Sequence, residues 1–296
     1  MDKFITVFTP TFNRAYCLGQ LYESLVSQTN QDFIWLIIDD GSSDGTEILV
    51  NSWIAKAKIE IKYVFQENQG MHGGHNTAYK NITTELNVCV DSDDYMPKNA
   101  IENIISTWKK NENGGYAGLI GLDAFKDDSI VGTKFPDGMS RTKYGYLKGL
   151  NITGDKKFVY KTDIIQKYPE YPIFKGEKFV PLNYKYLLID QDYDMLAVNE
   201  VYCIVEYLPD GSSKNIIRQY IRNPKGFEFE RKVRMKYAFT LTERFKNAVH
   251  YISCAIFLKN WNFISESSNK LLTILAIPFG ILLHIYIRNT SKKGWK

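Results

Sequence analysis

The sequence has few cysteines, and their spacing fits neither a metal site nor a disulfide framework. Four cysteines, Cys17, Cys89, Cys203 and Cys254, are scattered over 296 residues without a CxxC pair. This pattern favours a reduced, cytosolic protein. The N-terminal stretch MDKFITVFTPTFNR also lacks the long apolar core of a signal peptide. We therefore expect no secretion.

The composition excludes a disordered chain, since 44% of the residues are hydrophobic and 24% are charged. The length suits one large domain, or one domain with an appendage. Charge is uneven: residues 210–296 carry 16 Lys or Arg against 5 Asp or Glu, and the remainder carries 21 against 28. Such a basic part favours an anionic membrane surface or a nucleic acid. No nucleic-acid-binding motif accompanies the charge, so we expect no nucleic acid partner.

The basic part contains one long apolar run, LLTILAIPFGILLHIYI, at residues 271–287. It is short for a membrane-spanning helix and contains Pro278 and Gly280, but it suits a helix that lies in or dips into a bilayer. A buried core helix is the alternative. The residues around it suit the lipid headgroup region: Lys270, Arg288, Lys292, Lys293, Trp295 and Lys296.

In the first half of the chain, apolar runs alternate with segments of helical periodicity. We expect strands at 4–12, 33–40, 59–66 and 85–91, and helices at 14–28, 46–57 and 73–82. Near-continuous apolar strands that alternate with helices indicate a parallel sheet covered on both faces, hence an α/β fold. After residue 216 the pattern changes to basic helices. We therefore predict a catalytic domain at 1–215 and a helical, membrane-associating region at 216–296.

Four polar clusters follow the expected strands: TPTFNR, DDGSSDGT, ENQGMHGGHN and DSDD. Ligands of parallel α/β sheets bind beyond the carboxyl ends of the strands, so the clusters are expected to share one crevice. In DDGSSDGT, Ser42, Ser43 or Asp44 could cap the following helix. A calcium loop is excluded, because Asn51 stands where such a loop needs a glutamate.

The cluster HGGH at residues 72–75 allows two interpretations. It could be a fragment of a zinc site. Its two glycines fit close approach of the backbone to a phosphate better.

The cluster DSDD places Asp91, Asp93 and Asp94 directly after a strand, where like charges repel one another. A strand-end turn with solvated acids is one interpretation. The other is a divalent cation, Mn²⁺ or Mg²⁺, held by one or two carboxylates together with phosphate oxygens and water. Such a cation would neutralise a diphosphate leaving group.

The motifs TPTFNR, IIDDGSSDGT and VDSDDYMP, in this order near the N-terminus, resemble those of family 2 glycosyltransferases with the GT-A fold. The resemblance covers about residues 3–110 and continues more weakly to about 215. It implies a nucleotide-sugar donor, usually a UDP-sugar, and transfer with inversion at the anomeric carbon.

The resemblance also implies roles for individual residues. Asp40 or Asp39 would contact the base, Asp91 the ribose or base, and Asp93 the metal, with Asp94 nearby. Gln69 replaces one glycine of the family's NGG-like segment. The implied donor-binding residues are Thr9, Pro10, Thr11, Asn13, Arg14, Asp39, Asp40, Ser42, Gly70, His75, Asn76, Asp91 and Ser92.

An inverting transfer needs a carboxylate that takes the proton of the acceptor hydroxyl. The candidate is Glu177 in PIFKGEKFVP, where related enzymes carry an acidic pair and this sequence has Glu-Lys. An ion-paired surface glutamate is the alternative for Glu177, and Asp190, Asp192 and Asp194 are further candidates for the base. Asp155 is expected to contact the acceptor.

These expectations describe a metal-dependent transferase that moves a sugar to a hydroxyl of a glycan or lipid-linked acceptor in bacterial polysaccharide or capsule synthesis. We expect it at the cytoplasmic face of the cell membrane, peripheral or shallowly inserted. The segment YLPDGSSKN at 207–215 either closes over the donor phosphates or forms a plain turn.

Two other classes of protein are possible. A sugar nucleotidyltransferase needs a glycine-rich, arginine-containing loop after the first strand, which TPTFNRAYCLG is not. A non-catalytic, nucleotide-sugar-binding membrane scaffold would lack the metal ligands or the base.

Overall fold

The computed structural model describes residues 3–206 and 216–293, with side chains to residue 290. The chain divides into two compact units. Unit 1 comprises Met1–Glu170 and Asp192–Leu208, and unit 2 comprises Tyr171–Gln191 and Pro209–Lys296. The helical unit thus includes a segment, residues 171–191, that the sequence pattern had grouped with the catalytic domain.

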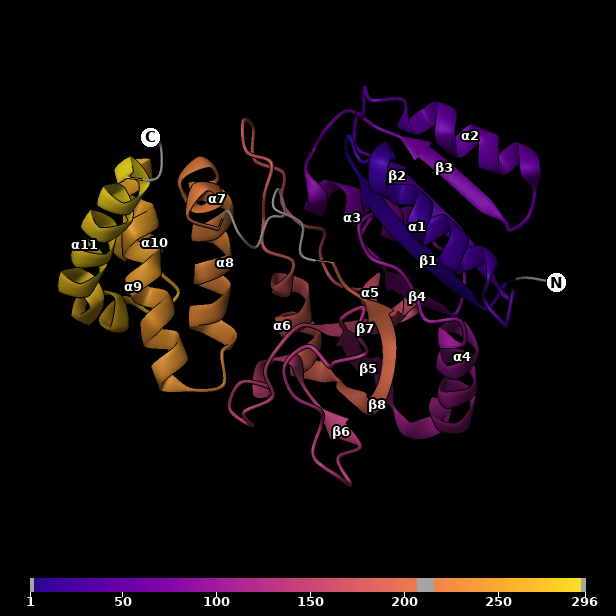
Figure 1. The fold of residues 1–296 in the computed structure, drawn as a ribbon. Helices are drawn as coiled ribbons and strands as arrows, with labels where there is room; N and C mark the ends of the chain where they lie inside the picture. Colours follow the sequence, from indigo (N-terminus) through magenta and orange to yellow (C-terminus); the bar gives the residue numbers. More distant parts are fainter. Residues whose placement is uncertain (1–2, 207–215, 294–296) are drawn as a thin grey trace. The chain divides into compact units, whose positions relative to one another are not determined.

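Unit 1 is built on one eight-stranded sheet with the order β3-β2-β1-β4-β7-β5-β8-β6 (Figure 1). The strands are β1 (Ile5–Thr11), β2 (Phe33–Asp39), β3 (Ile61–Phe65), β4 (Leu86–Cys89), β5 (Tyr116–Ala124), β6 (Arg141–Thr142), β7 (Lys156–Lys161) and β8 (Asp194–Ile204). Strand β1 pairs in parallel with β2 and β4, and β2 with β3, which confirms the expected parallel half. The antiparallel insertion of β7 between β4 and β5 was not predicted.

The helices of unit 1 cover both faces of the parallel half, as expected. They are α1 (Ala15–Val26), α2 (Thr46–Lys56), α3 (Met71–Asn81), α4 (Ala100–Asn111) and α5 (Thr162–Ile165), with 3-10 turns at Glu112–Gly114 and Tyr144–Tyr146. Tyr22 of α1 stacks on Trp53 of α2, with 4.4 Å between ring centroids, and both lie against Trp35 of β2. On the opposite face, Phe8 of β1 contacts Tyr79 of α3.

The middle of the sheet is held by close backbone packing. All nine residues of β5 are buried. A Cβ at Gly118 would lie 2.0 Å from the carbonyl oxygen of Val159 on β7, so only glycine fits at this position. The register of β5 with β8 shifts between the pairs Ile120–Ala197 and Leu122–Val201. This shift adds two residues to β8, and a bulge of this kind re-aims the neighbouring side chains.

Unit 2 is helical, as the sequence after residue 216 predicts. Its helices are α6 (Asn183–Asp192), which reaches the unit boundary, α7 (Ile216–Arg222), α8 (Pro224–Tyr237), α9 (Leu241–Leu258), α10 (Phe263–Glu266) and α11 (Lys270–Lys293). Proline suits the first position of α8, where its missing N–H is not needed. Thr240 caps α9 by accepting a hydrogen bond from the backbone N–H of Glu243.

The α9 and α11 helices form the core of unit 2. Tyr251 and Ile252 of α9 pack with Leu272 and Ala276 of α11. Gly280 allows the two helices to approach closely, because a Cβ there would lie 2.5 Å from the Cβ of Ile252. The helix-breaking tendency of this glycine is therefore offset by tight packing.

The opposite side of α11 is apolar and exposed. Within the described residues, Lys270–Thr290 is the segment long and apolar enough to cross a membrane by length and composition. Large exposed apolar side chains recur along it at helical spacing: Leu271, Ile274, Leu275, Phe279, Ile281, Leu282, Ile285 and Tyr286. The helix thus has one face in the core of unit 2 and one apolar face without cover from unit 2.

Candidate functional site

The loop after β1 is tied to the loop after β2 by hydrogen bonds. Asn13, with a positive φ of 53°, donates its backbone N–H to Ser42 Oγ at 2.9 Å. Its side-chain oxygen accepts the N–H of Ser43 at 2.8 Å. Asp44 accepts the N–H of Ala15 at 2.9 Å and the N–H and hydroxyl of Thr46. Two motifs that are about 30 residues apart in sequence therefore form one preorganised wall at the carboxyl edge of the sheet.

Asp39 and Asp40 are both buried and organise the loops around them. Asp39 accepts hydrogen bonds from the backbone N–H of Ser42 and the hydroxyl of Tyr63. Asp40 accepts the N–H groups of Gln69 and Gly70 at 2.8 and 2.7 Å. Asp40 also accepts the side-chain N–H of Gln66 at 2.6 Å. Base recognition by either residue stays a prediction.

Thr9, Pro10 and Thr11 form the end of β1. Thr9 is buried; its hydroxyl donates to the carbonyl of Val90 at 2.8 Å and accepts from the indole N–H of Trp35. Thr9 is therefore a buried residue that connects β1 by a hydrogen bond to Val90, directly before the DSDD cluster.

The HGGH cluster lies inside unit 1, in the first turns of α3. His72, His75 and Asn76 are buried, and the ring of His75 packs edge-on against Phe8 at 5.1 Å. A Cβ at Gly74 would lie 3.0 Å from Cβ of Pro10. This glycine therefore allows α3 to pack closely on β1, and phosphate contact by the HGGH cluster stays a prediction. Gly70, with a φ of 85°, uses its N–H to hold Asp40.

The DSDD cluster forms a tight turn after β4, closed by a hydrogen bond from the N–H of Asp94 to the carbonyl of Asp91. Asp91 is exposed, and Ser92 is buried. The carboxylate of Asp93 lies 3.6 Å from the guanidinium of Arg14, and both side chains are about one-fifth exposed. Arg14, from the loop after β1, is thus one positive group beside the acidic cluster.

Asp94 belongs to a second, buried charge cluster. It accepts the backbone N–H of Glu206 at 3.1 Å. Burial raises the pKa of Asp94 to about 7, against the opposing attraction of Lys157. Burial alone would lower the pKa of Lys157, but neighbouring acidic groups, Asp123 first, hold it well above its usual value. Lys157 also forms an ion pair with Asp123 at 3.9 Å.

Lys157 is a buried positive charge near the DSDD turn that the sequence analysis missed. It follows Lys156 on β7, and successive strand side chains point to opposite faces. Lys156 donates to main-chain carbonyls, among them those of Val131 and Thr153, and so holds a loop. Strand alternation in the KKFVYK segment could have separated the two lysines, but β7 itself was not predicted.

Glu177 lies in unit 2 at the start of α8. Its two carboxylate oxygens accept the backbone N–H groups of Lys225 and Gly226 at 3.0 and 2.9 Å. It is 8% exposed, so the alternative of a surface glutamate is wrong. The free N–H groups of a helix N-terminus favour such a carboxylate.

The other acidic candidates have their own surroundings. Asp190 is buried in α6, and Asp192 accepts the hydroxyl of Tyr168 at 2.7 Å. Asp194 is paired with Arg141 and Lys143. Asp155 is exposed and directly precedes β7, and its contact with the acceptor stays a prediction. The segment at 207–215 lies outside the described residues.

The residues of the DSDD turn fit a hard divalent cation. No group of three or more His, Cys, Asp or Glu within the described ranges could hold a metal ion. The accessible carboxylates of Asp91 and Asp93 nevertheless offer the oxygen ligands that Mn²⁺ and Mg²⁺ prefer. Asp94 fits less well, because its carboxylate points into the buried cluster and is already bonded there. A cation at this turn therefore needs further oxygen ligands besides the two carboxylates, such as phosphate oxygens and water.

The family model "Glycosyl transferase family 2" matches residues 6–168, which is more than half of the chain. The chain belongs to glycosyl transferase family 2. The family is one of transferases. The matched residues contain the DSDD turn and the two hydrogen-bonded loops after β1 and β2, whereas Glu177 lies outside the match.

This family 2 protein matches some relatives over nearly their whole length and others over only a part. A Campylobacter jejuni relative, "GalNAc(5)-diNAcBac-PP-undecaprenol beta-1,3-glucosyltransferase", is 26% identical, with 96% of this chain and 93% of the relative covered. Escherichia coli "UDP-Glc:alpha-D-GlcNAc-diphosphoundecaprenol beta-1,3-glucosyltransferase WfgD" is 27% identical, with 67% and 74% covered. An uncharacterized glycosyltransferase of Nostoc sp. is 29% identical over 36% of this chain. The match spans about a third of the length of that relative.

Solved structures confirm the GT-A fold. S. aureus TarS 1-349 in complex with UDP-GlcNAc has a TM-score of 0.59 at 14% identity, with 98% of this chain and 92% of that chain covered. Mannosyltransferase PcManGT from Pyrobaculum calidifontis, in complex with GDP-Man and Mn2+, has a TM-score of 0.57 at 17% identity, with 99% and 84% covered.

Proposed function

We propose that the protein is a metal-dependent, inverting glycosyltransferase that moves a sugar from a UDP-sugar to a hydroxyl of a lipid-linked glycan. The observation that carries this proposal is the DSDD turn. It presents Asp93 beside Arg14 at one edge of the sheet. The loops of Asn13 and Ser42, which are joined by a hydrogen bond, lie at the same edge. Such an edge is where parallel α/β sheets bind nucleotides.

The donor is held by the residues around this edge. Thr11, Asn13, Arg14 and Ser42 line the nucleotide pocket, and Asp40 and Asp91 contact the base and ribose. Their loops are already fixed by hydrogen bonds, so little conformational freedom is lost when the donor binds. Arg14 reaches Asp93 and is placed to contact an anionic diphosphate as well.

Asp93 would hold the divalent cation, with Asp91 as the second accessible carboxylate. When bound, the cation supplies charge neutralisation for the leaving nucleoside diphosphate. Asp94 supports this turn from inside by accepting the N–H of Glu206. We therefore narrow the direct metal contact to Asp93 and Asp91.

Glu177 is the proposed base that takes the proton of the acceptor hydroxyl. Each of its oxygens accepts one main-chain N–H, which fixes the carboxylate in one orientation. Each oxygen keeps a further lone pair, so capping of α8 and proton acceptance are compatible. Preorganisation of this kind is what an in-line displacement requires.

The proposed acceptor is lipid-linked, and the proposed location is the cytoplasmic face of the membrane. Two relatives are named as glucosyltransferases that act on undecaprenol-linked acceptors. The exposed apolar face of α11, with Lys270 and Arg288 near its two ends, fits a helix that lies in the membrane interface. A role in cell-surface polysaccharide or capsule synthesis follows from this acceptor class.

The test measures release of nucleoside diphosphate from a panel of UDP- and GDP-sugars, with Mn²⁺, with Mg²⁺ and with EDTA. We expect one donor to be cleaved in the presence of metal, and cleavage to fall at least about a hundredfold in Asp93→Ala. Asp137→Ala is the control, because Asp137 is an exposed carboxylate of unit 1 that belongs neither to the DSDD turn nor to the proposed donor residues. Binding of a donor without cleavage or transfer would instead support a non-catalytic binding protein.

A further inference from the structure

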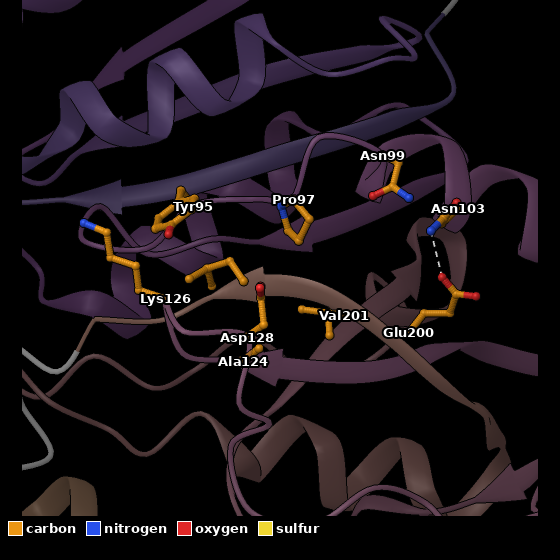
Figure 2. Close-up of a pocket in the computed structure, with 10 residues that line it drawn as sticks. Tyr95, Pro97, Asn99, Asn103, Ala124, Lys126, Asp128, Glu200 and Val201 are labelled. Carbon is orange, nitrogen blue, oxygen red and sulfur yellow. Dashed lines mark hydrogen bonds between the residues drawn. The ribbon is translucent and has the colours of Figure 1, made fainter.

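A cavity outside the proposed donor residues lies at the carboxyl ends of β5 and β8. Its volume is about 430 Å³, within the usual range of small-molecule sites. Figure 2 shows Tyr95 and Lys126 on one side, Asn103 and Glu200 on the other, and Asp128 between them. All the lining residues belong to unit 1.

The floor and the rim of this cavity differ in chemistry. Pro97, Ala124, Val201 and Ile204 give it an apolar floor, and amide, carboxylate, ammonium and phenol groups form the rim. Asn103 donates its side-chain N–H to Glu200 at 2.7 Å, which fixes one end of the rim.

Several polar groups of the rim are available to a ligand. Asn99 occupies the N-cap position of α4, yet its side chain makes no capping hydrogen bond. The side chains of Asn99, Lys126 and Asp128 have no hydrogen bond or ion pair in the part of the chain that the structure describes. Asp128 also has a positive φ of 66° in a turn closed by its N–H to the carbonyl of Phe125. The turn therefore holds both Lys126 and Asp128 at the rim.

The lining chemistry selects among classes of ligand. The lining contains two carboxylates, Asp128 and Glu200, and one ammonium, Lys126, so the excess negative charge opposes nucleotides, diphosphates and anionic lipid headgroups. A polar rim opposes lipid chains. A saccharide matches both parts, because its hydroxyls donate and accept hydrogen bonds and its C–H groups can cover an apolar floor.

The cavity is joined to the DSDD turn through the chain itself. Tyr95 is two residues beyond Asp93, and its backbone N–H and carbonyl pair with Ile204 at 3.0 and 2.7 Å. Tyr95 and Ile204 both line the cavity. A ligand there would thus contact the segment that positions the proposed metal ligand.

We propose that this cavity is a saccharide subsite that binds a sugar of the acceptor glycan other than the one that receives the new bond. This inference rests on the proposed transferase function. It implies that the acceptor is an oligosaccharide and not a single sugar on its carrier. Affinity for the acceptor would then depend on glycan length.

The first experiment measures binding without any reaction. We would titrate N-acetylglucosamine oligomers of one to five residues into the full chain and follow the side-chain amide NMR signals of Asn99 and Asn103. We expect the signals to shift with the longer oligomers and to stay unchanged with UDP alone. Absence of any shift at about 1 mM oligomer, the weak end of specific binding, would overturn the proposal.

The second experiment compares acceptors of one and several sugars on the same carrier. The double variant Asn99→Ala/Asp128→Asn should raise the KM for the long acceptor about tenfold and leave the short acceptor unchanged. The variant removes the amide of Asn99 and replaces the charged hydrogen-bond acceptor at residue 128 with a neutral amide. Lys98→Ala is the matched control, since Lys98 is exposed next to Asn99 and does not line the cavity. An equal KM for the long acceptor in the double variant and the wild type would overturn the subsite.

The two proposals fail in different ways. If no acceptor receives a sugar, the proposed transfer is wrong, and the NMR titration still decides whether the cavity binds saccharide. If transfer occurs and glycan length has no effect on KM, the transferase stands and the subsite does not.

Discussion

The two units use buried acidic groups in different ways. In unit 1, Asp94 and Asp123 surround a buried lysine, Lys157, at the carboxyl edge of the sheet. In unit 2, Glu177 binds two main-chain N–H groups at the start of a helix. A carboxylate paired with a side chain depends on that one partner, whereas a carboxylate at a helix N-terminus relies on main-chain N–H groups that only a substitution to proline removes.

The units also differ at their surfaces. Unit 1 keeps its large apolar side chains mostly inside, with isolated exceptions such as Ile48 on α2. Unit 2 exposes a continuous apolar face along α11. A single exposed apolar residue needs no partner, but a row of them marks an interaction surface. The proposed donor and metal residues thus belong to unit 1, whereas the proposed membrane contact and the proposed base, Glu177, belong to unit 2.

Removal of Lys157 should have the largest effect, because it leaves buried carboxylates without a counter-charge. We expect Lys157→Met to lower the free energy of unfolding of unit 1 by about 3–5 kcal/mol in urea denaturation. Lys134→Met, which removes an exposed lysine, should cost under about 0.5 kcal/mol.

The Lys157 loss should depend on pH. Burial raises the pKa of Asp123 in the folded state, so its contribution to stability is lost as pH rises. The free energy of unfolding of Lys157→Met should therefore be lower at pH 8 than at pH 5. Adding Asp123→Asn to this variant should restore part of the lost stability. A loss independent of pH would contradict the cluster.

Charged groups on the exposed face of α11 should weaken membrane binding. Leu275 and Leu282 are 58% and 64% exposed. We expect Leu275→Glu/Leu282→Glu to reduce binding to phosphatidylglycerol vesicles by at least about a hundredfold, since burial of each leucine contributes about 1.5–3 kcal/mol. Vesicle co-sedimentation measures the loss, and the unfolding midpoint should stay the same.

Ile48→Glu is the matched control in unit 1, where Ile48 is 78% exposed. Equal binding of wild type and the α11 variant to vesicles would show that this face does not contact lipid.

Gly280→Ala should lower the stability of unit 2 and leave that of unit 1 unchanged. Its Cβ would lie 2.5 Å from Cβ of Ile252 and 3.0 Å from the carbonyl of Val249, so α9 and α11 must move apart. We expect a loss of about 1–3 kcal/mol in unit 2, measured by hydrogen exchange of α9 amides. Gly19→Ala in α1 has open space around it and should stabilise slightly.

His250 should make unit 2 sensitive to mild acid. Burial, reinforced by Arg231, lowers the pKa of His250 from 6.5 to about 4. Between these values the unfolded state binds more protons, so stability falls as pH falls. We expect unfolding at pH 5 to cost about 2 kcal/mol less than at pH 7.5, and His250→Gln to remove this difference. An unchanged pH profile in the variant would contradict this role.

The parallel half of the sheet could be predicted because its signals are local. Each of β1 to β4 is an apolar run, and each is followed by a polar cluster. The rule that ligands bind beyond the carboxyl ends then identified the edge that carries Asp93. The family resemblance rested on the same motifs, and the family match confirmed it.

Contacts between distant segments could not be predicted in the same way. The pairing of β7 between β4 and β5 brings Lys157 toward Asp94, a residue 63 positions earlier. The role of Glu177 as a cap depends on α8, which starts at Pro224. The cavity under Tyr95 requires α4 and the shifted register of β8.

By itself, the sequence determined the class of fold, the order of the first strands and helices, and the motif that presents Asp93. These follow from periodicity and from residues close together in the chain. Tertiary structure alone decided which carboxylate faces solvent and which is buried with Lys157, because burial and charge pairing depend on strand order. It also decided that one face of α11 packs on α9 and the other stays exposed, since an apolar run by itself does not show which side has a partner.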